Sequence, residues 1–268
     1  MPHGSQGSGI ELESYRTYAP GDDLRHLDWN AYGRLDQLLI KAFRAEREAP
    51  LHVFVDCSAS MGFPDTDLKL AVAAALAVSL AYINVSNHDP VRVVSLSAAL
   101  PRFHFASAFC RHRQAMPRIV DFVTQMQAAG DTALARGISH ALQAHPTAGV
   151  AVVLSDFLMP TREYEAALSE LLARGYTVSA VRLLGTGERE PESYFRRGRI
   201  VDSESGAERF VTLSQQNIER YRQALADHLE SLRRFCRRAG VAFAVADTAA
   251  DLEESVFGQL PGAGTVRT

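Results

Sequence analysis

Apolar runs and stretches of helical periodicity alternate along the chain between residue 51 and residue 246. The apolar runs are nearly continuous and rich in valine, which is typical of parallel strands covered on both faces of a sheet. These runs predict strands at residues 51 to 55, 91 to 97, 150 to 155, 176 to 184 and 241 to 246.

Between the runs, apolar residues recur at steps of three and four, which is the spacing of an amphipathic helix. This spacing predicts helices at residues 67 to 84, about 112 to 127, 133 to 143, 162 to 173 and 215 to 238. Regular alternation of strand and helix indicates an α/β fold with a doubly wound, mostly parallel, Rossmann-like sheet.

Two segments predict hairpins. Residues 98 to 105 follow the second apolar run too closely for a crossover helix, so we expect a turn into an antiparallel strand at one edge of the sheet. Pro101 is compatible with an edge strand, where a missing backbone N–H is tolerated. Residues 198 to 213 hold two alternating pieces around Ser203-Glu204-Ser205-Gly206 and predict a protruding hairpin.

The chain divides by composition into four parts. Residues 1 to 9 are rich in glycine and serine and are expected to be a disordered lead-in. Residues 10 to 49 are rich in charge, contain the turn signal Pro20-Gly21-Asp22-Asp23 and predict a small β-containing appendage. The α/β domain is predicted from residue 50 to residue 258, and residues 259 to 268 are predicted to form a flexible tail.

The bulk composition excludes several classes of function. Hydrophobic residues make up 47% and charged residues 22% of the 268 residues, as in a soluble globular protein. A net charge of -3 gives no general attraction to nucleic acid or to an anionic membrane. The three cysteines are far apart and odd in number, which indicates a reducing compartment rather than a disulfide framework.

The most apolar stretch is residues 68 to 85, and it carries Lys69. It lacks the flanks and the length of a membrane span, so we predict a buried helix. The first residues lack the basic start and apolar segment of a secretory signal. We therefore expect a cytoplasmic protein without a membrane span.

Two aspartates follow directly on apolar runs, Asp56 after the first and Asp156 after the third. In a doubly wound sheet, ligands bind beyond the carboxyl ends of the strands, where the strand order reverses. If these two strands are neighbours, both carboxylates face one crevice. Asp56 also begins the pattern Asp-x-Ser-x-Ser, in which alternate residues point the same way, so that Ser58 and Ser60 present hydroxyls beside it.

These oxygens suit a hard divalent cation such as Mg²⁺ or Mn²⁺. Soft metals are disfavoured, because no histidine and cysteine cluster has ligand spacing. A further oxygen is expected from Gly130-Asp131-Thr132, which precedes a predicted helix. We assign the metal contact to Thr132 and the capping of the helix to Asp131.

The segments VFVDCSASM, GDTALARGI and VVLSDF resemble the metal-ion-dependent adhesion site of von Willebrand factor A domains. That site consists of Asp-x-Ser-x-Ser, then a threonine, then an aspartate, in this chain order. The resemblance implies that Ser58, Ser60 and Thr132 contact the cation directly or nearly so. It implies that Asp56 and Asp156 bind the cation directly or through water, and that the fold is von Willebrand factor A-like.

The stretch from Tyr15 to Trp29, YRTYAPGDDLRHLDW, resembles the signature of bacterial domain-of-unknown-function family 58, and the similarity extends from about residue 9 to residue 258. Members of that family look like A-domain proteins that act with a MoxR-type AAA+ ATPase in chaperone-like maturation or stress response. The resemblance implies a non-catalytic, cation-dependent protein-binding module. An acidic side chain of the ATPase or of its client would complete the coordination of the cation.

Two other functions stay open. One is a Mg²⁺-dependent phosphohydrolase, although that chemistry favours a second aspartate two residues after Asp56, and Ser58 stands there. The other is a structural scaffold whose cation site stays empty. The stretch from Tyr15 to Trp29 has two interpretations as well, a binding surface or a structural element whose charged residues pair around the Pro-Gly turn.

Overall fold

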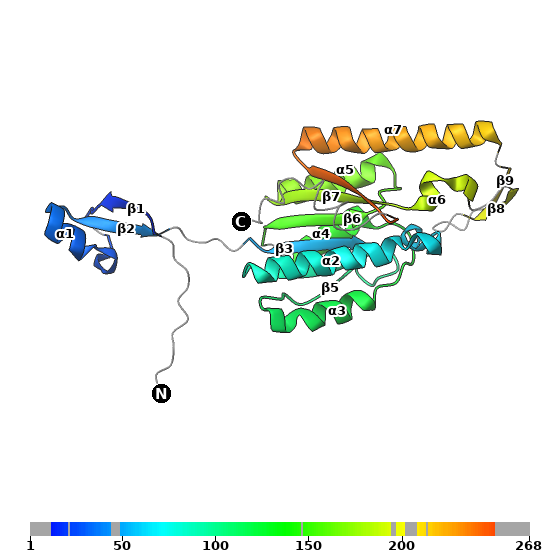
Figure 1. Ribbon diagram of the computed structural model, residues 1–268. Helices are drawn as coiled ribbons and strands as arrows, with labels where there is room; N and C mark the ends of the chain where they lie inside the picture. The colour runs from blue at the N-terminus through cyan, green and yellow to red at the C-terminus, as the bar shows by residue number, and fades with distance from the viewer. Residues whose placement is uncertain are drawn as a thin grey trace. The chain divides into compact units, whose positions relative to one another are not determined.

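The computed structural model describes residues 12–20, 22–43, 49–145, 147–193, 197–201, 208–212 and 214–249 (Figure 1). Contacts divide the chain into two compact units, Met1–Glu48 and Ala49–Thr268, and each is described by itself. The predicted lead-in and the predicted flexible tail lie outside the described residues.

The first unit contains a two-stranded antiparallel sheet. Strand β1 (Leu12–Thr17) pairs with β2 (Leu39–Phe43). Between the strands lie the short helices η1 (Leu24–His26) and α1 (Trp29–Leu35). The small β-containing appendage expected from the sequence is therefore present.

Charged residues of the first unit pair with one another. Arg16 donates two hydrogen bonds of 2.6 Å to the carboxylate of Asp22. Arg25 donates from Nε and from its terminal nitrogen to Asp23, two residues before it. Exposed pairs of this kind add little stability, but they agree with the interpretation of the turn region as a structural element.

The second unit contains a six-stranded sheet with the strand order β10-β7-β6-β3-β4-β5. Neighbouring strands are parallel except β4 and β5, which are antiparallel. The strands are β3 (Leu51–Asp56), β4 (Val91–Leu96), β5 (His104–Ala106), β6 (Val150–Ser155), β7 (Thr177–Leu184) and β10 (Ala242–Asp247). The mostly parallel sheet and its antiparallel edge strand are confirmed.

The strand order reverses at β3. From β3 the chain passes through a helix to β4 on one side, and after β5 it returns to β6 on the other side of β3. The connections that leave β3 and β6 therefore diverge, and the carboxyl ends of these two strands mark the position at which ligands bind in doubly wound sheets.

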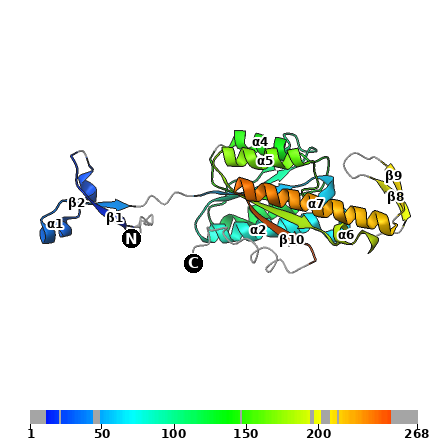
Figure 2. The same cartoon turned by 90° about the horizontal axis from the view of Figure 1, so that it is seen from above.

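Helices cover both faces of the sheet, and Figure 2 shows α4 and α5 side by side. Buried residues of α2 and α3 belong to one core cluster, and those of α4, α5 and α7 belong to the other. These helices are α2 (Lys69–Ser86), α3 (Met116–Thr124), α4 (Leu134–Ala144), α5 (Thr161–Ala173) and α7 (Gln215–Ala239). The shorter ones are η2 (Ala59–Gly62), η3 (Asp65–Asp67), η4 (Arg113–Ala115), α6 (Thr186–Arg189) and η5 (Pro191–Ser193).

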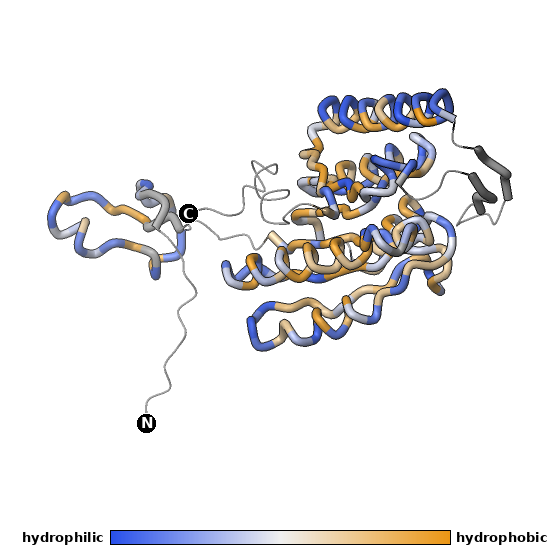
Figure 3. Tube along the Cα trace, turned by 45° about the vertical axis from the view of Figure 1, so that its right-hand side comes forward, coloured by the Kyte–Doolittle hydropathy of each residue, from blue (hydrophilic) through white to orange (hydrophobic). Residues whose placement is uncertain are grey.

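Helix α2 is apolar along most of its length, and most of its trace is orange in Figure 3. By length and hydropathy alone it could cross a membrane, but it packs against β3 and β4, and 44% of it is buried inside the domain. The buried positions Ala73, Ala77 and Ala81 are small, which lets the helix approach the sheet closely. In this domain α2 is a core helix, as predicted.

Helices α2 and α3 differ most from their predicted bounds, and the other three long helices agree with theirs to within one residue at each end. Helix α2 begins two residues later than predicted, because Leu68 has a φ of 51° and this left-handed conformation cannot continue a helix. Helix α3 is shorter at both ends than the predicted 112 to 127. Pro117 lies in its first turn, where the missing backbone N–H leaves no hydrogen bond unmade.

The second predicted hairpin is present. Strand β8 (Arg197–Val201) pairs antiparallel with β9 (Glu208–Thr212). The segment that joins them, which contains the predicted turn, lies outside the described residues.

Candidate functional site

Two aspartates lie at the carboxyl ends of the neighbouring parallel strands β3 and β6. Asp56 is the last residue of β3, and Asp156 follows Ser155, the last residue of β6. Each of the two aspartates is 1% exposed. The adjacency of these strands was the condition for both carboxylates to face one crevice, and the sheet fulfils it.

Two hydrogen bonds hold the carboxylate of Asp56. Its Oδ2 accepts a bond of 2.6 Å from the hydroxyl of Ser155, and its Oδ1 accepts one of 2.9 Å from the backbone N–H of Ser58. Burial, followed by the charge of Asp156, raises the pKa of Asp56 to about 6, and the two hydrogen bonds offset this only in part. Negative charge is therefore concentrated at this end of the sheet.

The two motif serines lie directly beside Asp56. Ser58 is fully buried, and its hydroxyl oxygen lies 3.1 Å from that of Ser60, so that one of the two donates to the other. Ser58 stands at the N-terminus of η2, whose tight turn brings the two hydroxyls to the same side. The Asp-x-Ser-x-Ser pattern therefore gathers three oxygen-bearing side chains, as expected from the sequence.

Backbone hydrogen bonds attach the loop before α4 to this turn. Ala129 donates to the carbonyl of Cys57, and Ala59 donates to the carbonyl of Gly130, each at 2.9 Å. Gly130 has a φ of 73°, and a Cβ there would come within 2.8 Å of the backbone nitrogen of Ala99. Glycine is therefore required for the close approach that brings the loop, two residues before Thr132, against the Asp56 turn.

The capping role predicted for Asp131 is wrong. Helix α4 starts at Leu134, and the residue before it, Ala133, gives no side-chain cap. Instead Glu163 of α5 accepts a hydrogen bond of 3.1 Å from the backbone N–H of Ala135 in the first turn. Asp131 lies too far before the helix to cap it, and its carbonyl accepts instead from Ala98.

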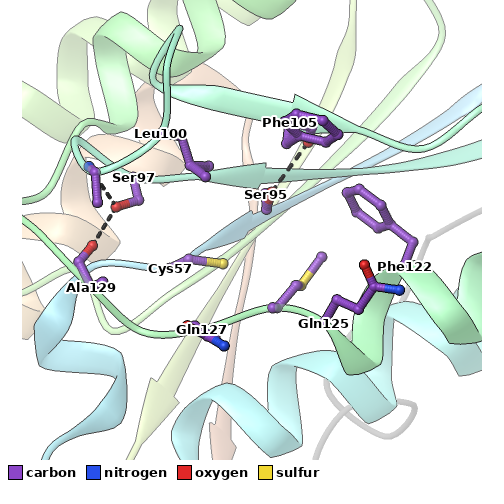
Figure 4. A pocket seen from close by; sticks show the side chains of 11 residues that line it. Cys57, Ser95, Ser97, Leu100, Phe105, Phe122, Gln125, Gln127 and Ala129 are labelled. Carbon is purple, nitrogen blue, oxygen red and sulfur yellow. Dashed lines mark hydrogen bonds between the residues drawn. The ribbon is translucent and has the colours of Figure 1, made fainter.

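Cys57 points away from the two motif serines. Its thiol lines a cavity of about 350 Å³ between β4, β5 and the loop that follows α3 (Figure 4). Burial, together with the charge of Asp56, raises the pKa of this thiol to about 12. The thiol stays protonated and is a poor metal ligand, which agrees with the expectation that Cys57 turns away.

A buried ionic network continues from Asp156 into the domain. The Nζ atom of Lys69 donates to Oδ2 of Asp156 at 2.8 Å and to Oε1 of Glu188 at 2.7 Å. Arg182 donates to Oε2 of Glu188 at 3.0 Å and from Nε to the backbone carbonyl of Asp156 at 3.1 Å. These side chains are at most 7% exposed, so solvent screens the charges only weakly.

The sequence pattern does not predict this network. It marks Lys69 only as a charge within an apolar stretch, and it gives no role to Arg182 or Glu188. A signal did exist, because a basic residue inside an apolar strand or helix is rarely buried without a partner. Naming the partner required knowledge of the three-dimensional contacts.

The donor set fits a hard cation. Within the described ranges no three histidine, cysteine or acidic residues gather, so hydroxyls would have to complete any coordination sphere. Asp56, Ser58 and Ser60 supply oxygens at one turn, and the loop with Thr132 is bonded to that turn. Oxygen ligands with few charges are the set that Mg²⁺ and Mn²⁺ accept.

Comparisons with known proteins identify the family of the chain. The family model described as "Protein of unknown function DUF58" matches residues 14–231. An uncharacterised protein of Mycobacterium tuberculosis is 29% identical over 240 residues, which are 87% of this chain and 73% of the relative.

Two solved structures resemble the chain more distantly. An aerotolerance-related membrane protein from Bacteroides fragilis is 14% identical with a TM-score of 0.45, over 79% of this chain and 98% of that protein. A von Willebrand factor type A protein from Catenulispora acidiphila is 14% identical with a TM-score of 0.39, over 79% of this chain and 41% of that protein.

Proposed function

The chain belongs to the DUF58 family of proteins of unknown function, and on that premise we propose that its main domain is a divalent-cation-dependent protein-binding module. Its fold is von Willebrand factor A-like, with the parallel sheet and single antiparallel edge strand described above. Folds of this kind typically serve as interaction modules rather than as enzymes.

The observation that carries the proposal is the gathering of oxygen-bearing side chains at the end of β3. Asp56, Ser58 and Ser60 lie within one turn, and hydrogen bonds join that turn to the loop before Thr132. Asp156 stands at the end of the neighbouring strand. These five residues are the proposed cation ligands, directly or through water.

The hydroxyl ligands explain why such a site suits the binding of a partner protein. They carry no formal charge, so the ligand set neutralises little of the charge of a divalent cation. When bound, Mg²⁺ or Mn²⁺ would supply an open coordination position for a carboxylate of the partner. The buried turn of β3 holds Asp56 and Ser58 in place, so little ordering is needed when the partner arrives.

Exposed apolar side chains flank the site in sequence and support a protein partner. Phe63 is 62% exposed and Leu68 is 60% exposed, and both follow the Asp-x-Ser-x-Ser turn. Leu158 is 42% exposed and lies two residues after Asp156. Large apolar residues that stay exposed beside polar groups are typical of protein-interaction surfaces.

The proposed partner is a MoxR-type AAA+ ATPase or its client, which would contribute an acidic side chain. This part rests on the family resemblance. A cytoplasmic location fits it, and the cysteines Cys57, Cys110 and Cys236 are all free and buried. No observation favours phosphoryl transfer, since the position that would hold its general acid is Ser58.

Calorimetric titration with Mg²⁺ and with Mn²⁺ tests the cation site. We expect the wild type to bind one ion and Asp56→Asn to lose binding while it stays folded. Asp121→Asn, on the exposed surface of α3, is the matched control and should bind like the wild type. Equal binding by all three proteins would refute the site.

A pull-down tests the partner. We expect a MoxR-type ATPase expressed with this chain to be captured in Mg²⁺ and lost in a chelator. The double variant Phe63→Ser and Leu158→Ser should weaken capture without changing the affinity for Mg²⁺. Capture that is equal with and without chelator would support a structural scaffold instead.

A further inference from the structure

Lys69 neutralises Asp156 from the side of the domain interior. Its ammonium group donates to one oxygen of Asp156, and the other oxygen accepts from the backbone N–H of Leu158 at 3.2 Å. Asp56 is held differently, because its hydrogen bonds come from an uncharged hydroxyl and a backbone amide. The two carboxylates of the candidate site therefore differ in how much of their charge is balanced within the protein.

The position of Lys69 is fixed by the elements around it. Asp67, two residues earlier, accepts hydrogen bonds of 3.1 and 2.9 Å from the backbone N–H of Gly187 in α6. A Cβ on Gly185 would come within 1.9 Å of Asp67, so the two segments lie in close contact. Lys69 is also the first residue of α2, and it is 1% exposed. Its ammonium group cannot swing into solvent without moving these elements.

The ammonium group of Lys69 lies between two carboxylates, 2.8 Å from Oδ2 of Asp156 and 2.7 Å from Oε1 of Glu188. It therefore places a positive charge next to a proposed cation ligand.

We propose that Lys69 sets the affinity of the candidate cation site, where it holds Asp156 in an ion pair and so limits the negative charge offered to a divalent cation. This inference rests on the proposed function. Asp56 is then the carboxylate that dominates cation binding, and affinity stays low enough for the partner's carboxylate to contribute strongly. Glu188 has the opposite influence on cation affinity. It also pairs with Lys69, so less of the positive charge of Lys69 is balanced against Asp156.

Coulomb interactions decide whether each substitution raises or lowers the affinity of the site for Mg²⁺. Lys69→Met has similar length but no charge, so it removes a repulsion and releases Asp156. Because the ion pair is buried and solvent screens it only weakly, we expect Mg²⁺ affinity to rise at least roughly tenfold. Glu188→Gln removes a negative charge and should lower the affinity.

The experiment is a calorimetric titration of the full chain with Mg²⁺ alone. The wild type, Lys69→Met, Glu188→Gln and the site variant Asp56→Asn are compared at one ionic strength. Circular dichroism and thermal melting with and without Mg²⁺ verify that each protein is folded. Glu188→Gln retains the size of the side chain and one of its two acceptor oxygens, so it provides a milder second test if Lys69→Met unfolds.

The expected result is tighter binding by Lys69→Met and weaker binding by Glu188→Gln, a pair of opposite shifts that general destabilisation cannot produce. If both variants bind like the wild type, or both bind more weakly, the role of Lys69 is refuted while the cation site stands. If the wild type fails to bind and Lys69→Met binds, the proposed function fails but Lys69 is the residue that prevents binding. If no protein binds, both proposals are wrong.

Discussion

The hydroxyl of Ser155 donates a hydrogen bond of 2.6 Å to Oδ2 of Asp56, although the two residues are 99 positions apart in the chain. The same hydroxyl oxygen accepts from the backbone N–H of Phe157 at 2.9 Å. Ser155 therefore connects the end of β3 to the loop that carries Asp156. This connection aligns the two aspartates of the candidate site with each other.

Ser155→Ala should destabilise the fold. The substitution leaves one oxygen of a buried carboxylate and one buried backbone N–H without their hydrogen-bond partner, which costs about 1–3 kcal/mol. Urea unfolding measures the loss. Ser79→Ala is the control, because its exposed hydroxyl donates only to a carbonyl of its own helix, and it should change stability by less than about 0.5 kcal/mol. Similar losses in both variants would contradict the role of Ser155.

Thr132→Val should weaken cation binding. Valine keeps the shape of threonine and removes one oxygen from the proposed ligand set, so we expect roughly tenfold lower Mg²⁺ affinity by calorimetry. Thr124→Val is the matched control, since the hydroxyl of Thr124 donates to a carbonyl within α3. An unchanged affinity in Thr132→Val would remove Thr132 from the ligand set.

Glu163→Ala should destabilise the domain by about 1 kcal/mol, because the N-terminus of α4 loses the acceptor that Glu163 gives to Ala135. Glu163→Gln keeps an acceptor oxygen and loses the charge, so it should fall between the alanine variant and the wild type. Thermal melting compares these with Glu165→Ala on the same helix. A smaller effect of Glu163→Ala than of Glu165→Ala would argue against the cap.

His52 should make stability depend on pH. It is fully buried in β3 and accepts a hydrogen bond of 3.0 Å from Nε of Arg92, and burial, followed by the charges of Arg92 and His145, lowers its pKa to about 3. The folded state therefore keeps His52 neutral while the unfolded state takes up a proton below its ordinary pKa of about 6.5. Stability must fall as the pH drops through this window.

The measurement is urea unfolding of the wild type and of His52→Gln between about pH 7 and pH 4. In this range the loss in the free energy of unfolding that His52 causes approaches roughly 1.4 kcal/mol per pH unit. Glutamine can still accept the hydrogen bond from Arg92 but does not titrate. The wild type should lose more stability on acidification than the variant. Parallel pH profiles would show that His52 is not the cause.

Local patterns were sufficient for most of the fold and for part of the site. The valine-rich runs predicted β3, β4, β6, β7 and β10, because continuous apolar residues mark strands covered on both faces. The short spacing after β4 predicted the antiparallel edge strand β5. The arrangement of Asp56, Ser58 and Ser60 could be predicted as well, since neighbours in a tight turn are close whatever the rest of the chain does.

The capping prediction at the start of α4 failed for a physical reason. Asp131 was expected to cap α4 because an aspartate at the start of a helix usually caps it, but Glu163 of another helix accepts the N–H of Ala135 instead. The helix end needs an acceptor at hydrogen-bond distance, and a neighbouring helix can supply it as well as the preceding loop can. Periodicity contains no information about which helices pack together.

The amino-acid sequence by itself determined the element order, the parallel sheet and the oxygen-bearing turn at Asp56, because these depend on residues close together in the chain. The tertiary structure decided that Lys69, Glu188 and Arg182 surround Asp156. Charge interactions depend on distance in space and on burial, and neither follows from separation along the chain. How strongly the site can hold a cation is therefore a property of the folded sheet and not of its motif.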